Sequence, residues 1–337
     1  MEKALRAKPV APHLVPCWRE RDNHRWAVIL AGGDGKRLLP LTRRIAGDDR
    51  PKQFCSILGN ETLLSQTRRR VGRIVSPKKT LVVVTEKHER FYADQVAGLH
   101  SSCLLVQPYN CGTGPAIIYS LLRVRALDPR AVIAFFPSDH HFADDEALVA
   151  AIEPAFRAAE RRFHGVVLLG IKPFRPEVEY GWVEPGTRLT KQGSLFRVSR
   201  FWEKPSLALA SELMNRGCLW NGFIMVGRVD CFLSLIRRTL PDLVRSVESI
   251  EPAFFTGAER EALLDLYSGV TATNFSETVL SAAPYDLAVL SAGDLGWSDL
   301  GDTARVLSVL ERKGVRPEWA FGVQEEESAR YLRVAVG

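Results

Sequence analysis

Short apolar runs alternate with amphipathic segments through the first half of the chain. Apolar, β-branched runs predict strands, and apolar residues spaced three and four apart predict helices. The predicted strands span residues 26–30, 80–84, 103–106, 131–136 and 165–170, and the predicted helices span 61–74, 87–99, 113–127 and 144–163. Almost continuously apolar strands separated by helices are typical of a parallel sheet covered on both faces. The pattern therefore predicts an α/β fold with a mostly parallel sheet and helices on both faces.

The pattern becomes irregular after residue 170. Further strands are predicted in the segments YGWVEPG (180–186), LFRVSRFWEKP (195–205) and LWNGFIMV (219–226), with a helix at 207–217. A last helix is predicted at 303–314, with Asp299 or Asp302 as its N-cap. We expect this smaller region to pack beside the main sheet and to close over its edge. No element is predicted for residues 315–337.

Composition and charge narrow the class of protein. The chain has 337 residues, of which 46% are hydrophobic and 25% charged, and these are ordinary globular values. No apolar run reaches the roughly 18–20 residues that span a bilayer, so we expect no membrane insertion. Residues 1–25 hold six Lys/Arg and three Asp/Glu. Their net charge of +3 is half of the net charge of +6 of the whole chain. We interpret this segment as a mobile basic leader that is dispensable for chemistry. The rest of the chain has no extended basic face with interleaved aromatic residues, which argues against nucleic acid as a partner.

The cysteine pattern points to a reducing compartment. The six cysteines stand at positions 17, 55, 103, 111, 218 and 231 and form no C-x-x-C pair. No histidine cluster has zinc-finger spacing. Because the chain also lacks a secretory signal, we expect reduced, mostly buried thiols in a cytoplasmic protein.

The sharpest local feature is the sequence LAGGDGKRLLPLT (30–42), directly after the first predicted strand. Its three glycines let backbone N–H groups approach a phosphate closely, and Lys36 and Arg37 supply positive charge. A Walker A loop is excluded because Arg37 stands where Ser or Thr is required, and a dinucleotide motif is excluded because Leu38 replaces its last glycine. The alternative is a tight strand-to-helix turn, which the adjacent basic pair disfavours.

Two further charged residues, Lys52 and Asp139, are candidates for binding phosphate and a metal ion. Lys52 in PKQF is a suitable point charge for phosphate, although a lone lysine is more often solvated. Asp139 lies just beyond the apolar strand 131–136, where ligands bind in open α/β sheets. A carboxylate there suits Mg²⁺, and a turn or N-cap is the alternative. His140 and His141 lack a third ligand at zinc spacing.

Polar residues in the second half complete the candidates. Glu203 and Lys204 in FWEKP can accept from sugar hydroxyls and donate to a phosphate, with a surface ion pair as the alternative. Asn221 in LWNGF and Asp299 in GWSDLGD are each unremarkable alone, because Asn in turns and Asp at caps are common.

The motifs taken in order resemble the sugar-1-phosphate nucleotidylyltransferases, and among them the mannose-1-phosphate guanylyltransferases most closely. They are LAGGDGKRLLPLT, PKQF, GTGPAI, PSDH, EYGWVEPG, FWEKP, WNGF and GWSDLGD, and the resemblance runs from Trp26 to about Leu310. It implies a Rossmann-like nucleotide-binding core with a smaller sugar-binding subregion. The expected catalytic domain is 26–314, with a nucleotide half at 26–170 and a sugar half at 171–300, followed by a tail at 315–337.

The resemblance also implies the reaction and the role of each residue. GMP passes from GTP to mannose 1-phosphate with Mg²⁺ as cofactor, and the enzyme is compatible with a homodimer. The implied nucleotide-binding residues are Leu30, Gly32, Gly33, Asp34, Gly35, Gln107, Gly112 and Thr113. Arg37 and Lys52 neutralise the triphosphate, Asp139 and Asp299 hold Mg²⁺, Gly181, Glu203 and Asn221 contact the sugar, and Lys204 contacts its phosphate.

Three alternatives remain open at this point. Gln107 stands where the mannose branch often has Glu, so another base (dTTP or UTP) or another hexose 1-phosphate is one alternative. A non-catalytic regulator that binds sugar nucleotides on the same fold is the second. A nicotinamide oxidoreductase is disfavoured by the missing dinucleotide motif. The phosphomannose isomerase half of the longer relatives is not expected in this chain.

Overall fold

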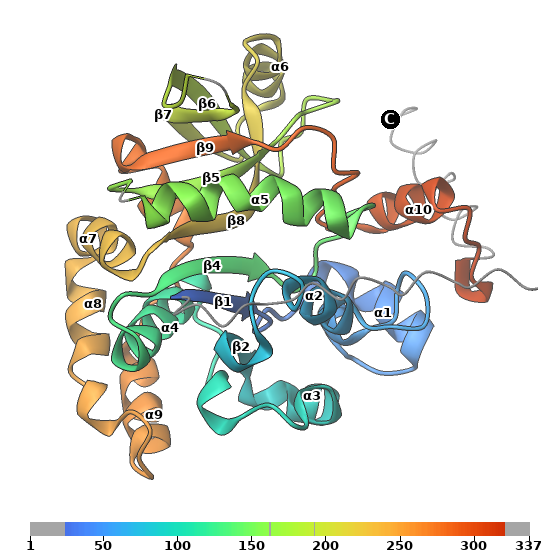
Figure 1. Cartoon of the computed structure of the whole chain (residues 1–337). Helices are drawn as coiled ribbons and strands as arrows, with labels where there is room; N and C mark the ends of the chain where they lie inside the picture. Colours follow the sequence, from blue (N-terminus) through green and yellow to red (C-terminus); the bar gives the residue numbers. More distant parts are fainter. Residues whose placement is uncertain (1–23, 162, 192, 321–337) are drawn as a thin grey trace, which may run out of the picture.

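A mixed sheet runs through the computed structural model of the protein, which describes residues 24–161, 163–191 and 193–320 (Figure 1). Within these residues the sheet has nine strands in the order β3-β2-β1-β4-β8-β5-β9-β7-β6. Their bounds are β1 Arg25–Leu30, β2 Thr80–Thr85, β3 Leu104–Gln107, β4 Val132–Pro137, β5 Val166–Ile171, β6 Gly181–Arg188, β7 Leu195–Glu203, β8 Leu219–Arg228 and β9 Leu287–Ser291. The expected tail and leader fall largely outside the described residues.

The direction of the strands corrects one expectation. Strands β1 to β4 are parallel to one another, and β5 is parallel to β9. Strand β8, however, runs antiparallel to both β4 and β5, and β6 and β7 are antiparallel as well. The α/β class is confirmed, but the sheet is mixed rather than mostly parallel. An apolar run buried on both faces has the same pattern in either direction, so periodicity does not report strand direction.

Helices cover both faces of the sheet, as predicted. Their bounds are α1 Leu39–Ala46, α2 Leu63–Val71, α3 Glu89–Val96, α4 Thr113–Leu127, α5 Asp145–Glu160, α6 Leu207–Asn215, α7 Val229–Thr239, α8 Pro241–Glu248, α9 Glu259–Gly269 and α10 Thr303–Arg312. Helices α4, α7, α8 and α9 bury their apolar residues in one core, and α2, α3, α5 and α6 in the other. Figure 1 shows α7, α8 and α9 stacked along one side of the molecule. The predictions missed these three helices.

A third apolar cluster joins the beginning and the end of the described chain. Leu38 and Leu41 pack there with Leu300, Val306 and Val309, so α1 and α10 lie together. Helix α10 is capped by Asp302, whose side chain accepts a hydrogen bond from the backbone N–H of Arg305. The N-cap is therefore Asp302, and Asp299 is left for another role.

Some smaller expectations are also decided by the structure. Arg25 begins β1 and its guanidinium pairs with Glu153 and Glu160, so this residue belongs to the folded domain rather than to the leader. Cysteines 55, 103, 111, 218 and 231 are free thiols, as predicted, and Cys17 lies outside the described residues. In the described part of the chain, no helix has the length and apolar character needed to cross a bilayer.

Candidate active site

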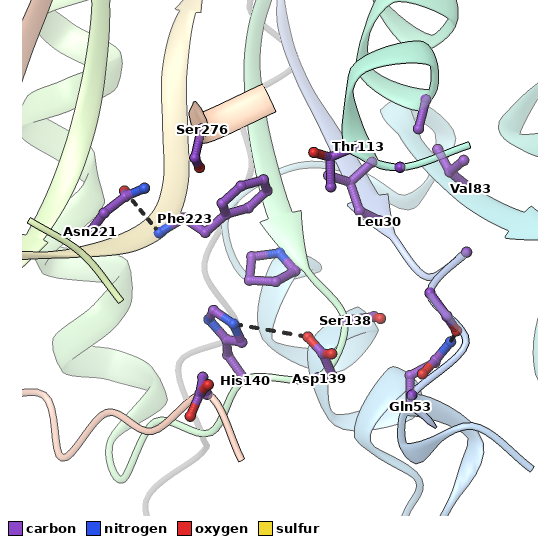
Figure 2. A pocket seen from close by; sticks show the side chains of 18 of the residues that line it. Leu30, Gln53, Val83, Thr113, Ser138, Asp139, His140, Asn221, Phe223 and Ser276 are labelled. Carbon is purple, nitrogen blue, oxygen red and sulfur yellow. Dashed lines mark hydrogen bonds and ion pairs between the residues drawn. The ribbon is translucent and has the colours of Figure 1, made fainter. Parts of the chain in front are cut away.

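A cavity of ≈ 440 Å³ opens at the carboxyl ends of β1 and β4, where the two halves of the chain meet. Its lining includes most of the predicted site residues: Leu30, Gly32, Gly33, Gly35, Gln107, Gly112, Thr113, Asp139, Gly181, Glu203, Asn221 and Asp299. Figure 2 shows Leu30 and Thr113 on one side of this cavity and Asn221 on the other, with Asp139 and His140 between them. The fold thus brings together residues that are far apart in the sequence.

A second cavity, of ≈ 450 Å³, adjoins the first and shares Gly35, Asn110 and Asp139 with it. Its lining adds the charged side chains of Asp34, Lys36, Arg37 and Lys52. The Arg37 side chain is exposed and pairs with Glu179 at 2.9 Å, and the Asp34 carboxylate pairs with Lys87 Nζ at 2.6 Å. The basic end of the glycine loop therefore lines a polar extension of the main cavity.

The glycine loop leaves β1 in a conformation that needs small residues. Gly35 has φ +61°, and a Cβ on it would lie 3.0 Å from the backbone nitrogen of Lys52. A Cβ on Gly32 would lie 2.6 Å from Gln107 Nε2. The side-chain amide of Gln53 fixes the loop by donating hydrogen bonds to the carbonyls of Ala31 (2.9 Å) and Gly33 (2.7 Å). Gln53 belongs to the PKQF motif, but it was not predicted as a site residue because it is uncharged, unlike its neighbour Lys52.

Lys52 connects the two predicted metal ligands. Its ammonium group lies 3.2 Å from Asp139 Oδ2 and donates to the backbone carbonyls of Asp299 (2.7 Å) and Leu300 (3.1 Å). Lys52 is 12% exposed at its side chain, so these contacts are largely shielded from water. The lysine from the nucleotide half thus lies between an aspartate of each half, and its predicted contact with a triphosphate stays a prediction.

Asp299 is buried in a network that sequence analysis did not find. Its Oδ1 accepts from the Tyr180 hydroxyl (2.8 Å), and both of its oxygens accept from Arg305 Nη1 at 2.9–3.0 Å. Burial alone raises the pKa of this carboxyl, but Arg305 and then Lys52 outweigh it and hold the pKa below its usual range. Asp299 is therefore an anion in the fold. Arg305 was missed because a single arginine in an amphipathic helix has the pattern of a surface residue.

The sugar side of the cavity is built on β6, β7 and β8. A Cβ on Gly181 would lie 2.9 Å from Glu203 Oε2, so the glycine makes room for that carboxylate. Burial raises the pKa of Glu203, with Lys204 and Asn274 opposing it. Asn221 Oδ1 accepts from the backbone N–H of Phe223 at 3.1 Å. A carboxylate and an amide facing one cavity can accept hydrogen bonds from hydroxyl groups.

Backbone strain gathers at the same place. Among the described residues, four non-glycine residues have positive φ, and three of them adjoin the cavity: Lys204 (+46°), Phe223 (+57°) and Leu300 (+49°). Such conformations cost of order 1–2 kcal/mol each and cluster at functional sites. The Lys204 side chain is exposed and does not line the cavity, although its neighbour Glu203 does. Its predicted contact with a sugar phosphate stays a prediction.

The two adjacent histidines have different surroundings. His140 lines the cavity, its Nδ1 accepts from Trp297 Nε1 at 3.2 Å, and its Nε2 lies 3.9 Å from Asp139 Oδ1. His141 is buried on a backbone bridge to Ser298 and does not line the cavity. Among the described residues, no group of three or more His, Cys, Asp or Glu side chains is placed to hold a metal by itself. Trp297 is a further site residue that the sequence pattern did not single out, and His140, which the sequence suggested only as a zinc ligand, lines the cavity.

Comparison with known proteins identifies the family. A family model described as nucleotidyl transferase matches residues 26–312, which is most of the chain. The chain belongs to this family. The family predicted from the motifs is therefore confirmed, and the glycine loop and the residues from Asp139 to Asp299 all lie inside the matched region of this nucleotidyl transferase.

Two curated relatives and one solved structure are similar to most of this chain. The xanthan biosynthesis protein XanB of Xanthomonas campestris pv. campestris is 30% identical over 295 residues, covering 85% of this chain and 60% of the relative. The mannose-1-phosphate guanylyltransferase of Escherichia coli K12 is 28% identical over 288 residues, covering 82% and 58%. The crystal structure of mannose-1-phosphate geranyltransferase from Thermus thermophilus superposes with a TM-score of 0.73 at 32% identity, covering 85% of this chain and 79% of that one. The chain thus spans about three fifths of the length of these two curated relatives.

Proposed function

We propose that this protein transfers GMP from GTP to mannose 1-phosphate in the cytoplasm, giving GDP-mannose and pyrophosphate. The observation that carries the proposal is the meeting of the two halves of the chain at one cavity. The glycine loop and Asp139 come from the first half, and Glu203, Asn221 and Asp299 come from the second. The names of the relatives support mannose 1-phosphate as the acceptor and a guanylyl group as the group transferred.

The proposed reaction requires little covalent participation of the protein. A phosphate oxygen of mannose 1-phosphate attacks the α-phosphorus of GTP in line, and the bond to the bridging oxygen of the departing pyrophosphate breaks. Positioning and charge neutralisation catalyse such transfers, so no side-chain nucleophile is required. In our assignment the glycine loop holds the triphosphate through backbone N–H groups. Lys52 and Arg37 neutralise its charge from the adjoining cavity.

The acidic residues fit Mg²⁺. Asp139 and Asp299 line one cavity, and Mg²⁺ commonly takes one or two carboxylates and leaves its other positions to phosphates and water. A cationic side chain lies against each of them, Lys52 at Asp139 and Arg305 at Asp299, and the pKa of Asp299 is held below its usual range by Arg305 and Lys52. When bound, the ion supplies charge stabilisation at the phosphates. We expect EDTA to abolish turnover and excess Mg²⁺ to restore it, whereas full activity in EDTA contradicts the assignment.

Product identification tests the proposal. The protein is incubated with ATP, CTP, GTP, UTP or dTTP and with mannose 1-phosphate or glucose 1-phosphate, and the products are identified by mass spectrometry. GDP-mannose as the main product supports the proposal. A second candidate, transfer from dTTP or UTP, is favoured by the amide of Gln107 in the cavity, and dTDP- or UDP-sugars as main products would establish it. No product with any pair would indicate a regulator that only binds sugar nucleotides.

A further inference from the structure

The inference concerns the edge of the sheet at β3. Within the described residues, β3 is the last strand on its side of the sheet and pairs only with β2. In the same part of the chain, residues 104–107 make no backbone hydrogen bond to any other segment. Every second residue of such a strand directs its N–H and C=O groups away from the sheet, where another strand can pair with them. Strand β3 therefore offers unused backbone groups.

The β3 groove, a cavity of ≈ 720 Å³, follows this edge and is lined by Leu104, Val106 and Pro108 at alternate positions of the chain. Helix α3 contributes to one side of the groove, and α4 and α9 contribute to the other. In Figure 1, α3 and α9 lie at the same end of the molecule, below β2. No described residue lines both the β3 groove and the substrate cavity. The edge strand thus lies in a groove that the proposed reaction does not use.

The side chains of the groove suit the two faces of an extended strand. Tyr92 belongs to the core on one face of the sheet, and Tyr119 and Leu263 belong to the core on the other, so the groove offers apolar surface on both faces. A bound strand would direct successive side chains to these two faces.

One aromatic ring is held at the groove in a strained conformation. Phe255 is the fourth non-glycine residue with positive φ among the described residues (+62°), and it is 45% exposed. Its backbone N–H donates to Glu259 Oε2 at 3.0 Å, and its ring lies 4.1 Å from the guanidinium carbon of Arg123. The left-handed conformation costs free energy in a residue with a bulky side chain, and such strain is typical of ligand-binding sites. The fold thus maintains an exposed ring beside the open edge.

The charges of the groove favour a basic ligand. Three glutamates and two arginines line it, and the arginines are already paired, Arg123 with Glu259 and Arg260 with Glu86. The third glutamate, Glu89, is exposed and has no ion pair within the described part of the chain. A lysine or arginine of a ligand would pair with it. The β3 strand of a second copy would not, because residues 101–109 read SSCLLVQPY and hold no basic residue.

We propose that the β3 groove binds an extended peptide segment of a partner protein, which adds to β3 as a further strand. The segment carries apolar side chains and a lysine or arginine that pairs with Glu89. Backbone hydrogen bonds to the open edge provide affinity, and the side-chain contacts provide specificity. Because the groove and the substrate cavity share no described residue, the inference does not depend on the proposed function.

Synthetic peptides test the binding. The probes are fluorescein-labelled hexapeptides with Val or Phe at alternate positions and Thr between them, in which one Thr is replaced by Lys or by Glu. Fluorescence anisotropy measures their dissociation constants with the full-length protein. We expect saturable binding of the Lys peptides, at least about fivefold tighter than that of the Glu peptides. No binding of any peptide, or equal binding of both sets, would overturn the proposal.

N-methylated peptides distinguish strand addition from other modes of binding. A strand at an edge uses every second backbone N–H for pairing with the sheet. The Lys peptide is therefore made in two forms, with N-methyl groups on its odd or on its even residues. We expect one form to bind about tenfold or more weaker than the parent peptide and the other to bind within about threefold of it. Equal loss in both forms, or loss in neither, would overturn strand addition.

Two variants of α3 place the binding in the groove. Glu89 and Asp94 are both exposed on this helix, but only Glu89 lines the groove. Glu89→Lys should reverse the preference, so that the Glu peptides bind tighter than the Lys peptides, and Asp94→Lys should keep the wild-type preference. Equal changes in both variants would overturn this location. Both variants should keep the wild-type kcat, which shows that they fold.

Sedimentation velocity separates a partner from a second copy of this chain. We expect the same oligomeric state of the full-length protein with and without saturating Lys peptide, because the groove is free to bind the peptide. A dimer that the peptide dissociates would show that a second copy occupies the groove, and would overturn the proposal.

Discussion

At the scale of single residues, the two first glycines of the loop have different roles. Gly32 faces Gln107 Nε2 at 2.6 Å and Thr85 Oγ1 at 3.0 Å, measured from the Cβ that a larger residue would carry, and Gly33 has nothing within 4 Å. Both belong to the same glycine-rich motif, so the sequence alone treats them alike. Only the neighbours supplied by β2 and β3 distinguish them.

This difference gives a matched pair of variants. Gly32→Ala should raise the KM for the nucleotide about tenfold or more, because overpacking costs about 1–3 kcal/mol or displaces the Gln107 amide. Gly33→Ala should leave the KM within about twofold, since its Cβ meets open space. Steady-state kinetics of the two variants checks the prediction, and equal effects would show that the loop backbone, rather than the Gln107 contact, is what matters.

The two aspartates differ in what surrounds them, although they share a proposed role. Asp139→Asn and Asp299→Asn should each lower kcat by about 10² or more, on the scale of removing one electrostatic contact. Asp139 has 29% of its side chain exposed, so its variant should unfold like the wild type. Asp299→Asn should also lower stability by about 1–3 kcal/mol, because it weakens a buried network with Arg305 and Tyr180.

Kinetics and urea unfolding of the two variants measure these effects separately. A loss of stability is expected for Asp299→Asn because the buried contacts with Tyr180 and Arg305 hold its carboxylate, and the sequence does not show these contacts. A near-normal kcat in either variant would contradict its place as a metal ligand, and Asp302 would not replace Asp299, because it caps α10.

At the scale of elements, α10 is the helix that ties the end of the described chain to the site. Arg305 on this helix is 8% exposed and contacts the carboxylates of Asp299, Glu177 and Asp302. Removing one partner of a buried ion-pair network leaves uncompensated charge, which costs about 3–5 kcal/mol. The helix therefore depends on one arginine for its docking as well as on its apolar face.

Two arginines of α10 make the corresponding test. Arg305→Met should lower the free energy of unfolding by about 3 kcal/mol and reduce activity, since Asp299 loses its partner. Arg312→Met should change stability by less than about 0.5 kcal/mol, because Arg312 is exposed and, among the described residues, donates only to the carbonyl of Ser308. Urea unfolding measures the stability of both variants. Similar stabilities would mean that packing of the apolar face alone docks α10.

At the scale of the whole molecule, the cavity is the joint product of two halves. Strand β8 comes from the second half of the chain but is inserted between β4 and β5 of the first, so the halves share one sheet. Strand β8, which carries Asn221, thereby pairs with β4, the strand that leads to Asp139, and Asn221 itself lies opposite Gly170 on β5. The nucleotide and the sugar phosphate should accordingly be bound on either side of this junction.

This division predicts separable kinetics. Lys204 follows β7 on the sugar side and holds a left-handed backbone conformation next to Glu203. Lys204→Ala should raise the KM for mannose 1-phosphate by about tenfold or more and leave the KM for GTP within about twofold, since a charged hydrogen bond contributes about 1.5–3 kcal/mol. Equal changes in both KM values, or none, would contradict the assignment of Lys204 to the sugar phosphate.

Much of the fold was predictable because its signals are local. The strands and helices of the first half have clean apolar periods, and the helices at 113–127 and 303–314 lie close to where they were expected. Helices α7 to α9 were not predicted, although α7 and α8 are amphipathic. Residues 229–269 contain none of the motifs or strand patterns on which the predictions were based. Strand direction was wrong in part, since a buried strand has the same apolar pattern either way.

The chemical groups of the site and their order can be read along the chain: a glycine loop, a lysine, a carboxylate after an apolar strand, and a second set of polar residues after residue 180. Which of these groups come into contact depends on the fold. It brought Lys52 between Asp139 and Asp299, assigned the cap of α10 to Asp302, and placed Arg305 behind the site. The physical reason is that motifs and periods arise from neighbours along the chain. Burial, pKa and hydrogen-bond direction depend instead on groups that come from distant segments.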